Sequence, residues 1–376
     1  MRPASEAEKA RLSALFVALC RIPSPFGHER ECADRVRAEL RGMGIGVEED
    51  EAGNLLARIP SLQAAPRQTG SERAVLLCAH LDTVETEAPI EPVLVDGGWE
   101  NAHEGILGAD NKAALAVMLE VARRATVEGS PVGLELLFTV SEEDALAGAK
   151  AFDVSRLTSE FGYVFDHATP IGEVVVASPT YFRLEASFRG KAAHAGIRPE
   201  DGRSAILAAA LAIAAMPLGR IDPQTTANVG SLKGGVGSTN VVPERCRLLA
   251  EARSLDPARV EQVVAGIVDA LHDGAAHAEC DVDVISEKLF TGYRVRPGAS
   301  ELAAAEAALR ACGYEPTRIQ TGGGSDANAL QAAGFPCLNL ANGTERNHEP
   351  TERVSVPALE GMLDVALALL DEAAAV

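Results

Sequence analysis

His80 and Asp82 follow directly on an apolar stretch, residues 74–79, that carries no charged side chain. Such a stretch predicts a strand buried on both faces, and positions i and i+2 of a strand point to the same side. A histidine held by a nearby carboxylate is a common form of metal ligand. An ordinary strand end beside a helix-capping aspartate is the alternative interpretation, and these two residues alone do not decide between them.

Acidic residues also follow two further segments that are rich in apolar side chains. Residues 133–140 and 161–165 predict buried strands, which lead into Glu142-Glu143 and into Asp166. Neighbouring carboxylates repel one another unless a cation or solvent separates them, so the first pair indicates either a metal site or a solvated turn. Ligands of open α/β sheets lie outside the carboxyl ends of the strands. Three buried strands that end in histidine or acid therefore indicate side chains that converge on one crevice.

Asp110 lies where a loop leads into a predicted helix over residues 113–124. Aspartate is a frequent N-cap, and a capping carboxylate can also bind a metal, so the two roles are compatible. A polar loop near the C-terminus, residues 343–350, adds a second histidine, His348. The complete candidate set is His80, Asp82, Asp110, Glu142, Glu143, Asp166 and His348.

Imidazole and carboxylate groups suit zinc, with cobalt or manganese as alternatives. Two histidines with three or more carboxylates exceed one tetrahedral site, but they fit two metals about 3.5–4 Å apart that share a bridging carboxylate. Such a pair lowers the pKa of a bound water, and a carboxylate that is not a ligand can accept the proton as general base.

The composition limits the partners and the compartment. The formal net charge of -20 argues against nucleic acid or an anionic membrane surface as a partner. No apolar run approaches the roughly 18 residues of a membrane span. The seven cysteines are odd in number and contain no Cys-x-x-Cys pair, which favours a reducing compartment, the cytoplasm, over a disulfide framework.

The length of 376 residues favours two domains. The pattern from residue 181 predicts a βαββαβ unit of the ferredoxin-like kind: strand 181–189, helix 202–216, strands 225–233 and 244–253, helix 256–273 and strand 281–289. We therefore expect an α/β domain from residues 1–178 and 293–376, with an α+β domain inserted at 179–292. Residues 61–73 are polar and predict a surface loop.

Taken together, the order and spacing of these motifs resemble those of the M20 family of di-zinc metallopeptidases, in particular its peptidase T-like branch. The resemblance extends over nearly the whole chain. The motifs that carry it are His80-Leu-Asp82-Thr-Val, Gly-Ala-Asp110-Asn, Ser-Glu142-Glu143, Asp166, Gly322-Gly-Gly-Ser-Asp and Asn347-His348-Glu349.

The resemblance implies a zinc-exopeptidase-like catalytic domain, a mixed sheet with helices on both faces, and an inserted lid or dimerisation domain. It implies that Asp110 bridges two zinc ions, that His80 and Asp166 complete one site, and that Glu143 and His348 complete the other. Asp82 would fix the tautomer of His80, and Glu142 would be the general base. A cis peptide after Asp110 is also implied. Asp144 to Gly148 and His167 depart from the family pattern.

For the inserted domain, the resemblance implies substrate-binding roles for three residues. Arg253 and Asn240 would bind the carboxylate of a short peptide, since the planar guanidinium meets a carboxylate with two hydrogen bonds. His194 would reach across a homodimer, formed through this domain, into the partner's active site. Taken without the resemblance, His194 is a turn histidine and Arg253 a surface charge.

The resulting hypothesis is a cytoplasmic, zinc-dependent aminopeptidase that acts on short peptides, tripeptides foremost. An N-acyl amino acid deacylase or a carboxypeptidase of the same fold is the alternative within the family, because a few pocket side chains decide substrate choice. A metal-binding scaffold without turnover is the alternative outside enzymes.

Overall fold

The computed structural model describes residues 2–61 and 73–376, so the loop expected at 61–73 lies almost entirely outside the described residues. By its internal contacts the chain divides into two compact units. The larger comprises Met1–Ala177, Arg294–Gln320 and Ser325–Val376, and the smaller comprises Ser178–Tyr293 and Thr321–Gly324.

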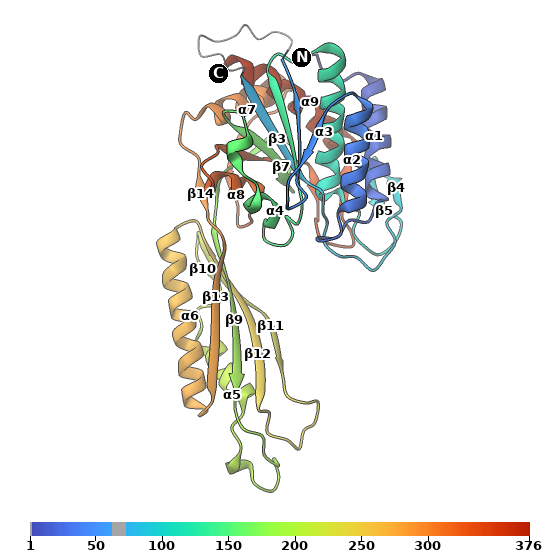
Figure 1. Cartoon of the computed structure of the whole chain (residues 1–376). Coiled ribbons are helices and arrows are strands. Elements are labelled where there is room, and N and C mark those ends of the chain that lie inside the picture. Colours follow the sequence, from blue (N-terminus) through green and yellow to red (C-terminus); the bar gives the residue numbers. More distant parts are fainter. Residues whose placement is uncertain (1, 62–72) are drawn as a thin grey trace. The chain divides into compact units, whose positions relative to one another are not determined.

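The larger unit is built on a nine-stranded mixed sheet (Figure 1). Its strand order is β1 (Val47–Glu49), β2 (Leu55–Ile59), β6 (Gly133–Thr139), β3 (Ala74–His80), β7 (Gly162–His167), β16 (Cys337–Ala341), β8 (Glu173–Ser178) and β14 (Tyr293–Arg294), with β15 (Thr317–Gln320) paired to β8. The four central strands β6, β3, β7 and β16 run parallel. Their residues are almost all buried, as expected for strands covered on both faces.

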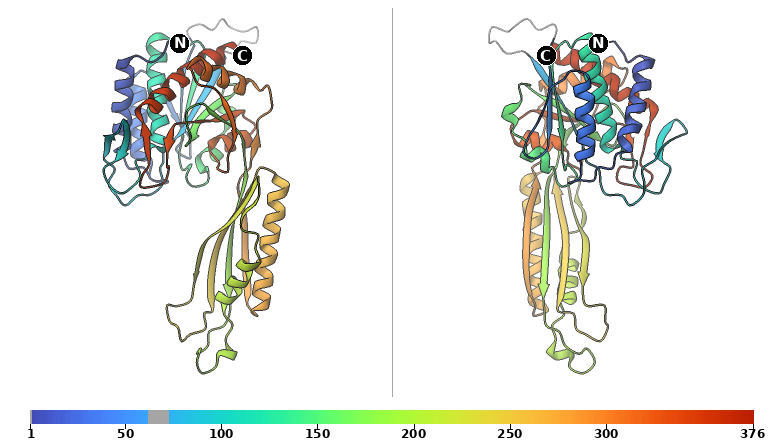
Figure 2. Two further views of the ribbon diagram at one scale, coloured as in Figure 1. Left: turned by 180° about the vertical axis from the view of Figure 1, so that it is seen from behind. Right: turned by 45° about the vertical axis from the view of Figure 1, so that its right-hand side comes forward.

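Helices cover both faces of this sheet (Figures 1 and 2). On one face, α3 (Ala109–Glu128) and α9 (Val356–Ala375) pack on β3, with α1 (Glu6–Cys20), α2 (Arg30–Gly42) and α7 (Ser300–Ala311) packed against them. The other face carries α8 (Asp326–Ala332) and α4 (Ala147–Ala151). A small sheet of β17 (Thr344–Glu345), β18 (Arg353–Ser355), β5 (Gly98–Asn101) and β4 (Pro92–Val95) flanks them.

The smaller unit is a five-stranded antiparallel sheet with two helices on one face (Figure 2). Its strand order is β10 (Gly219–Asp222), β11 (Thr225–Gly234), β12 (Arg245–Ser254), β9 (Thr180–Arg189) and β13 (Asp281–Phe290). The helices α5 (Ala205–Ala215) and α6 (Pro257–His277) bury alanine, valine and leucine side chains against it. The described order matches the expected βαββαβ pattern, with the short strand β10 added.

The glycine-rich segment 321–324 belongs by its contacts to the smaller unit, whereas the sequence analysis placed it in the larger one. The carbonyl of Gly322 accepts a hydrogen bond from Arg253, and that of Gly323 accepts one from Ser178. A Cβ atom on Gly324 would lie 2.3 Å from the ring of Phe290. The absence of side chains thus lets this segment lie against strands of the inserted unit, which the linear sequence does not reveal.

Candidate metal centre

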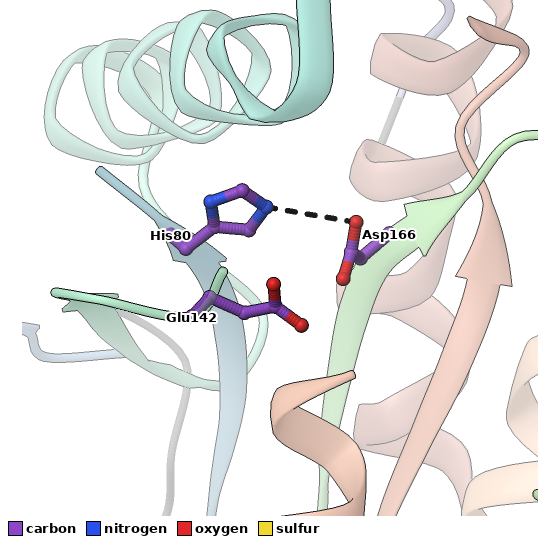
Figure 3. A group of neighbouring side chains, drawn as sticks. All are labelled: His80, Glu142 and Asp166. Atoms are coloured by element: carbon purple, nitrogen blue, oxygen red, sulfur yellow. Dashed lines mark ion pairs between the residues drawn. The ribbon is translucent and has the colours of Figure 1, made fainter. Parts of the chain in front are cut away.

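His80 is the centre of an acidic cluster at the carboxyl ends of β3 and β7. Its side chain is 1% exposed, and its Nε2 atom lies 3.1 Å from Asp110 Oδ1 and 3.7 Å from Asp166 Oδ1. Figure 3 shows the ring at the end of β3 facing Asp166 on β7, with the Glu142 carboxylate beside both. The convergence expected from the three strand ends is therefore present in the fold.

The second half of the cluster is formed by Asp110, Glu143 and His348. The other carboxylate oxygen of Asp110, Oδ2, lies 3.3 Å from His348 Nε2, and Glu143 Oε1 lies 2.8 Å from the same nitrogen. Asn347 donates a hydrogen bond to Asp110 Oδ2. Asp110 thus presents one oxygen to each histidine. The peptide bond from Asp110 to Asn111 is cis, as the resemblance implied.

The donor set fits divalent cations. Two groups of ligand atoms lie within 4.8 Å of one another: His80, Glu142 and Asp166 in one, and His80, Asp110 and Glu143 in the other. A tetrahedral ion with bonds of about 2.1 Å holds its ligand atoms about 3.4 Å apart. The distances of 2.8–3.7 Å around the two imidazoles are of that size.

The charges of the cluster also favour cations. Burial, and next the negative charge of Asp166, raise the pKa of Glu142 well above its usual range. Burial and the charge of Asp110 likewise raise the pKa of Asp166. Hydrogen bonds to Asp110 and Glu143 raise the pKa of His348 to about 10. Carboxylates outnumber imidazoles, so positive charge placed among them would relieve their repulsion.

Asp82 has a different main contact from the expected one. Its carboxylate lies 3.4 Å from His80 Nδ1, whereas its main-chain carbonyl lies closer, at 3.1 Å. The two carboxylate oxygens accept hydrogen bonds from the backbone N–H groups of Glu142 and Glu143, each at 3.0 Å. Asp82 therefore holds the Glu142–Glu143 backbone, and the Asp82 carbonyl is the nearer partner of the His80 ring.

The loop that carries Glu142 and Glu143 is closed on itself. Gly148 donates a hydrogen bond to the carbonyl of Val140, and a Cβ atom on Gly148 would lie 2.1 Å from that oxygen. Two side chains from the first 60 residues also hold this loop: Asn54 accepts from Val140 N–H, and Glu29 accepts from Ser141 N–H. Neither Asn54 nor Glu29 has a sequence motif that points to this role.

Two further buried residues, also missed by the sequence analysis, hold the ligand backbones. Glu352 is 2% exposed and accepts hydrogen bonds from the N–H groups of Leu107, Gly108 and Asp110. Burial raises the pKa of Glu352 to about 7. Asn339 on β16 pairs its amide with the backbone N–H and carbonyl of Asp166. A glutamate or an asparagine in the sequence carries no signal for such contacts.

The three predicted substrate-binding residues lie in the smaller unit, at two ends of its sheet. His194 pairs with Val241 in an isolated bridge, and Ala195 N–H donates to the carbonyl of Asn240, so His194 and Asn240 lie together. Arg253 lies near the far end of β12, eight residues beyond Arg245 and thus roughly 26 Å away at 3.3 Å per residue. One chain therefore does not bring Asn240 and Arg253 to the same carboxylate.

Arg253 lies in a small polar and aromatic environment. Its guanidinium carbon lies 4.1 Å from the centre of the Tyr181 ring, and its nitrogens donate to the carbonyl of Gly322 and to Glu251. The Nε atom of Arg253 is buried and has no hydrogen-bond partner among the described residues.

Two family models match the chain, one in each unit. The peptidase dimerisation domain of the M20 type matches residues 179–279, and peptidase family M28 matches residues 54–168. The second match covers only part of the larger unit, so relatives that match over the full length decide between the two families.

Three relatives that match over nearly the whole chain are each more than 30% identical to it. Aminopeptidase PepT from Bacillus cereus ATCC 10987 is 36% identical, covers 97% of this chain and 99% of its own, and superimposes with a TM-score of 0.85. A tripeptidase from Staphylococcus aureus is 32% identical over 98% and 99% of the two chains, with a TM-score of 0.90. The protein YqjE from Bacillus subtilis (strain 168), whose function is uncharacterised, is 36% identical over 97% and 98%.

Fold and comparisons define the class as hydrolases that act on peptide bonds and carry an inserted dimerisation domain. The chain belongs to the M20 peptidase family, in its peptidase T-like branch. The predicted family, fold class and enzyme class are thereby confirmed. Among the described residues, no helix has the length and apolar character needed to cross a bilayer.

Proposed function

We propose that this protein is a di-zinc aminopeptidase of the cytoplasm that removes the amino-terminal residue of tripeptides. The names of the B. cereus aminopeptidase and the S. aureus tripeptidase support this substrate class. The observation that carries the proposal is that Asp110 lies between two imidazoles, while the Glu142 carboxylate lies beside one of them, His80, without a hydrogen bond to any described residue. Cobalt or manganese could replace zinc on the same ligands.

The residues divide into two ligand sets and one base. His80, Asp166 and one oxygen of Asp110 would hold one ion, and Glu143, His348 and the other oxygen would hold the second. When bound, such ions lower the pKa of a water and polarise the scissile carbonyl. Glu142 accepts the proton of the attacking water and donates it to the leaving amine. Burial, and next the charge of Asp166, raise the pKa of Glu142.

The base assignment has a direct test. Glu142→Gln should retain both metals by elemental analysis and lower kcat by about 10²- to 10⁴-fold, the usual contribution of general acid–base catalysis. Wild-type turnover in this variant would refute the assignment. A panel of tripeptides and N-acyl amino acids, read by mass spectrometry, separates the substrate classes. Hydrolysis of N-acyl amino acids alone would indicate a deacylase, and two bound metals without any hydrolysis would indicate a scaffold.

We further propose that Arg253 binds the peptide carboxylate, and that His194 with Asn240 serves the active site of the other protomer in a homodimer. The support is the separation of Arg253 from the His194–Asn240 pair within one chain and the match to a dimerisation domain. A homodimer by light scattering is the first expected result.

Mixed dimers test the crossed arrangement. Glu142→Ala and His194→Ala homodimers should each be inactive, but subunit exchange between them should restore roughly one quarter of wild-type activity, because half the dimers then contain one complete site. No recovery after proven exchange would show that His194 serves its own protomer or no site.

A further inference from the structure

Asn347 contacts the carboxylate proposed to bridge the two ions, although it is not one of the proposed ligands. Its side-chain amide donates a hydrogen bond of 2.8 Å to Asp110 Oδ2, the oxygen that also lies 3.3 Å from His348 Nε2. Among the described residues, the imidazoles of His80 and His348 are the only other nitrogen groups that contact this carboxylate. The residue next to a proposed ligand therefore makes a contact of its own to the metal centre.

The other end of the Asn347 amide is unpaired. Its Oδ1 atom is buried and has no hydrogen-bond partner among the described residues. A buried acceptor without a partner costs free energy, and an apolar side chain at this position would avoid that cost. The hydrogen bond to Asp110 is thus the contact that an amide makes here and an apolar side chain could not.

This hydrogen bond concerns both proposed ions, because a carboxylate is one planar group. Asp110 Oδ1 faces His80, and Asp110 Oδ2 faces His348. The torsion about the bond between Cβ and Cγ is broad in aspartate, so a contact from outside is needed to hold the plane of the carboxylate. Rotation about this bond moves both oxygens at once, and a hydrogen bond that fixes Oδ2 therefore also fixes Oδ1.

The imidazoles do not hold this plane once ions are bound. His80 Nδ1 lies 3.1 Å from the carbonyl oxygen of Asp82, which makes Nδ1 the protonated nitrogen and leaves the lone pair on Nε2. A bound ion takes that lone pair, and His348 Nε2 would serve the second ion in the same way. A carboxylate oxygen has two lone pairs, so Oδ2 of Asp110 can bind an ion and still accept from Asn347.

The loop that carries Asn347 also holds the main chain of Asp110. Glu352, five residues later, accepts a hydrogen bond of 2.9 Å from the Asp110 N–H group. Within the loop, the guanidinium group of Arg346 donates to the carbonyl of Thr351 at 2.8 Å and thereby joins its two ends. One short loop therefore holds Asp110 at two points, the carboxylate through Asn347 and the backbone through Glu352.

We propose that Asn347 is a positioning residue that sets the plane of the Asp110 carboxylate and thereby the affinity of both metal sites. The inference rests on the proposed di-metal function, and it adds a residue outside the ligand set on which both ions depend. Loss of a hydrogen-bond partner of a metal ligand commonly lowers metal affinity by about 10- to 100-fold. Asn347→Leu keeps a side chain of similar size without the donor, so it should weaken the binding of each ion by about this factor.

The test is calorimetric titration of metal-free protein with Co²⁺, which the ligand set accepts in place of zinc. Wild type should bind two ions, and Asn347→Leu should bind each of them about 10- to 100-fold more weakly. His348→Ala removes a ligand of one site only, so it should lose one ion and keep the other. Glu345→Leu places the same side chain at an exposed position two residues before Asn347 and should bind both ions as wild type does.

Urea unfolding of the same metal-free proteins separates positioning from a purely structural role. Asn347→Leu removes the unpaired acceptor together with the donor, so its unfolding midpoint should equal or exceed that of wild type. A lower midpoint would make the weaker metal binding a consequence of a destabilised fold and would overturn the proposal.

The outcomes of the titration distinguish this inference from the proposed function. Unchanged affinities in Asn347→Leu, or a loss confined to one ion, would overturn the positioning role and leave the di-metal centre intact. If Asn347→Leu does not fold, Asn347→Ala decides in its place. Wild-type protein that binds fewer than two ions would instead refute the proposed function, and the positioning role with it.

Discussion

Asp326 allows a prediction of pH-dependent stability that follows from one buried carboxyl group. The side chain, at the start of α8, is 1% exposed; its Oδ2 atom accepts from Thr139, and its Oδ1 atom has no partner among the described residues. Burial raises the pKa of Asp326 from 3.8 to about 6. The folded protein therefore holds this proton more tightly than the unfolded chain does.

The sign and size of the effect of pH on the free energy of unfolding follow from this difference in pKa between the folded and unfolded states. Below pH 3.8 the carboxyl is protonated in both states, and its contribution to stability is complete; as pH rises through 6, the folded protein must lose the proton and that contribution disappears. A difference of about two pKa units corresponds to roughly 3 kcal/mol at 1.36 kcal/mol per unit. Asp326→Asn has no proton to lose and can still accept from Thr139, so it should escape this loss.

The assay is urea unfolding of metal-free protein between pH 4.5 and 8.5. The free energy of unfolding of Asp326→Asn minus that of wild type should rise by roughly 2 kcal/mol over this range, because about 1 of the 3 kcal/mol is already lost at pH 4.5. Asp96→Asn, an exposed acid in the turn between β4 and β5, is the matched control and should show no such rise. A difference that stays constant with pH would refute the claim that Asp326 titrates as a buried carboxyl.

Three other predictions concern the metal centre. Asp82→Ala leaves the N–H groups of Glu142 and Glu143 without their acceptor, so metal affinity or kcat should fall by about 10- to 100-fold, while far-UV circular dichroism stays as in wild type. Gly148→Ala places a methyl group against the carbonyl of Val140, and it should lower the free energy of unfolding by about 1–3 kcal/mol. A loss below about 1 kcal/mol would mean that the loop accommodates the methyl group without strain. Chelation of the metal should lower the unfolding temperature, and added zinc should restore it. A free zinc concentration 100-fold above its Kd raises the free energy of unfolding by about 2.7 kcal/mol. Calorimetry that shows no shift in unfolding temperature would argue against a metal site.

The sequence by itself predicted the parts of the molecule that depend on local pattern. The apolar run at residues 74–79 indicated the central strand β3, and the alternation from residue 181 indicated the inserted sheet with its two helices. These predictions succeeded because a strand buried on both faces has a continuous apolar sequence, and a strand or helix buried on one face has a periodic one. The short strands of the small sheet, such as β17 with two residues, leave no such trace.

Tertiary structure alone decided which groups support the candidate site. Glu352 is 242 positions from Asp110, and Glu29 is 112 positions from Ser141, yet their carboxylates hold those backbones. A contact of this kind depends on where two distant segments of the chain meet, and a glutamate in a polar loop has no pattern that reveals it. The separation of Asn240 from Arg253 is likewise a property of an extended strand that joins them, whereas their spacing of thirteen positions in the sequence is equally compatible with proximity. Sequence pattern determines which segments are buried, and packing determines which polar groups those segments bring into contact.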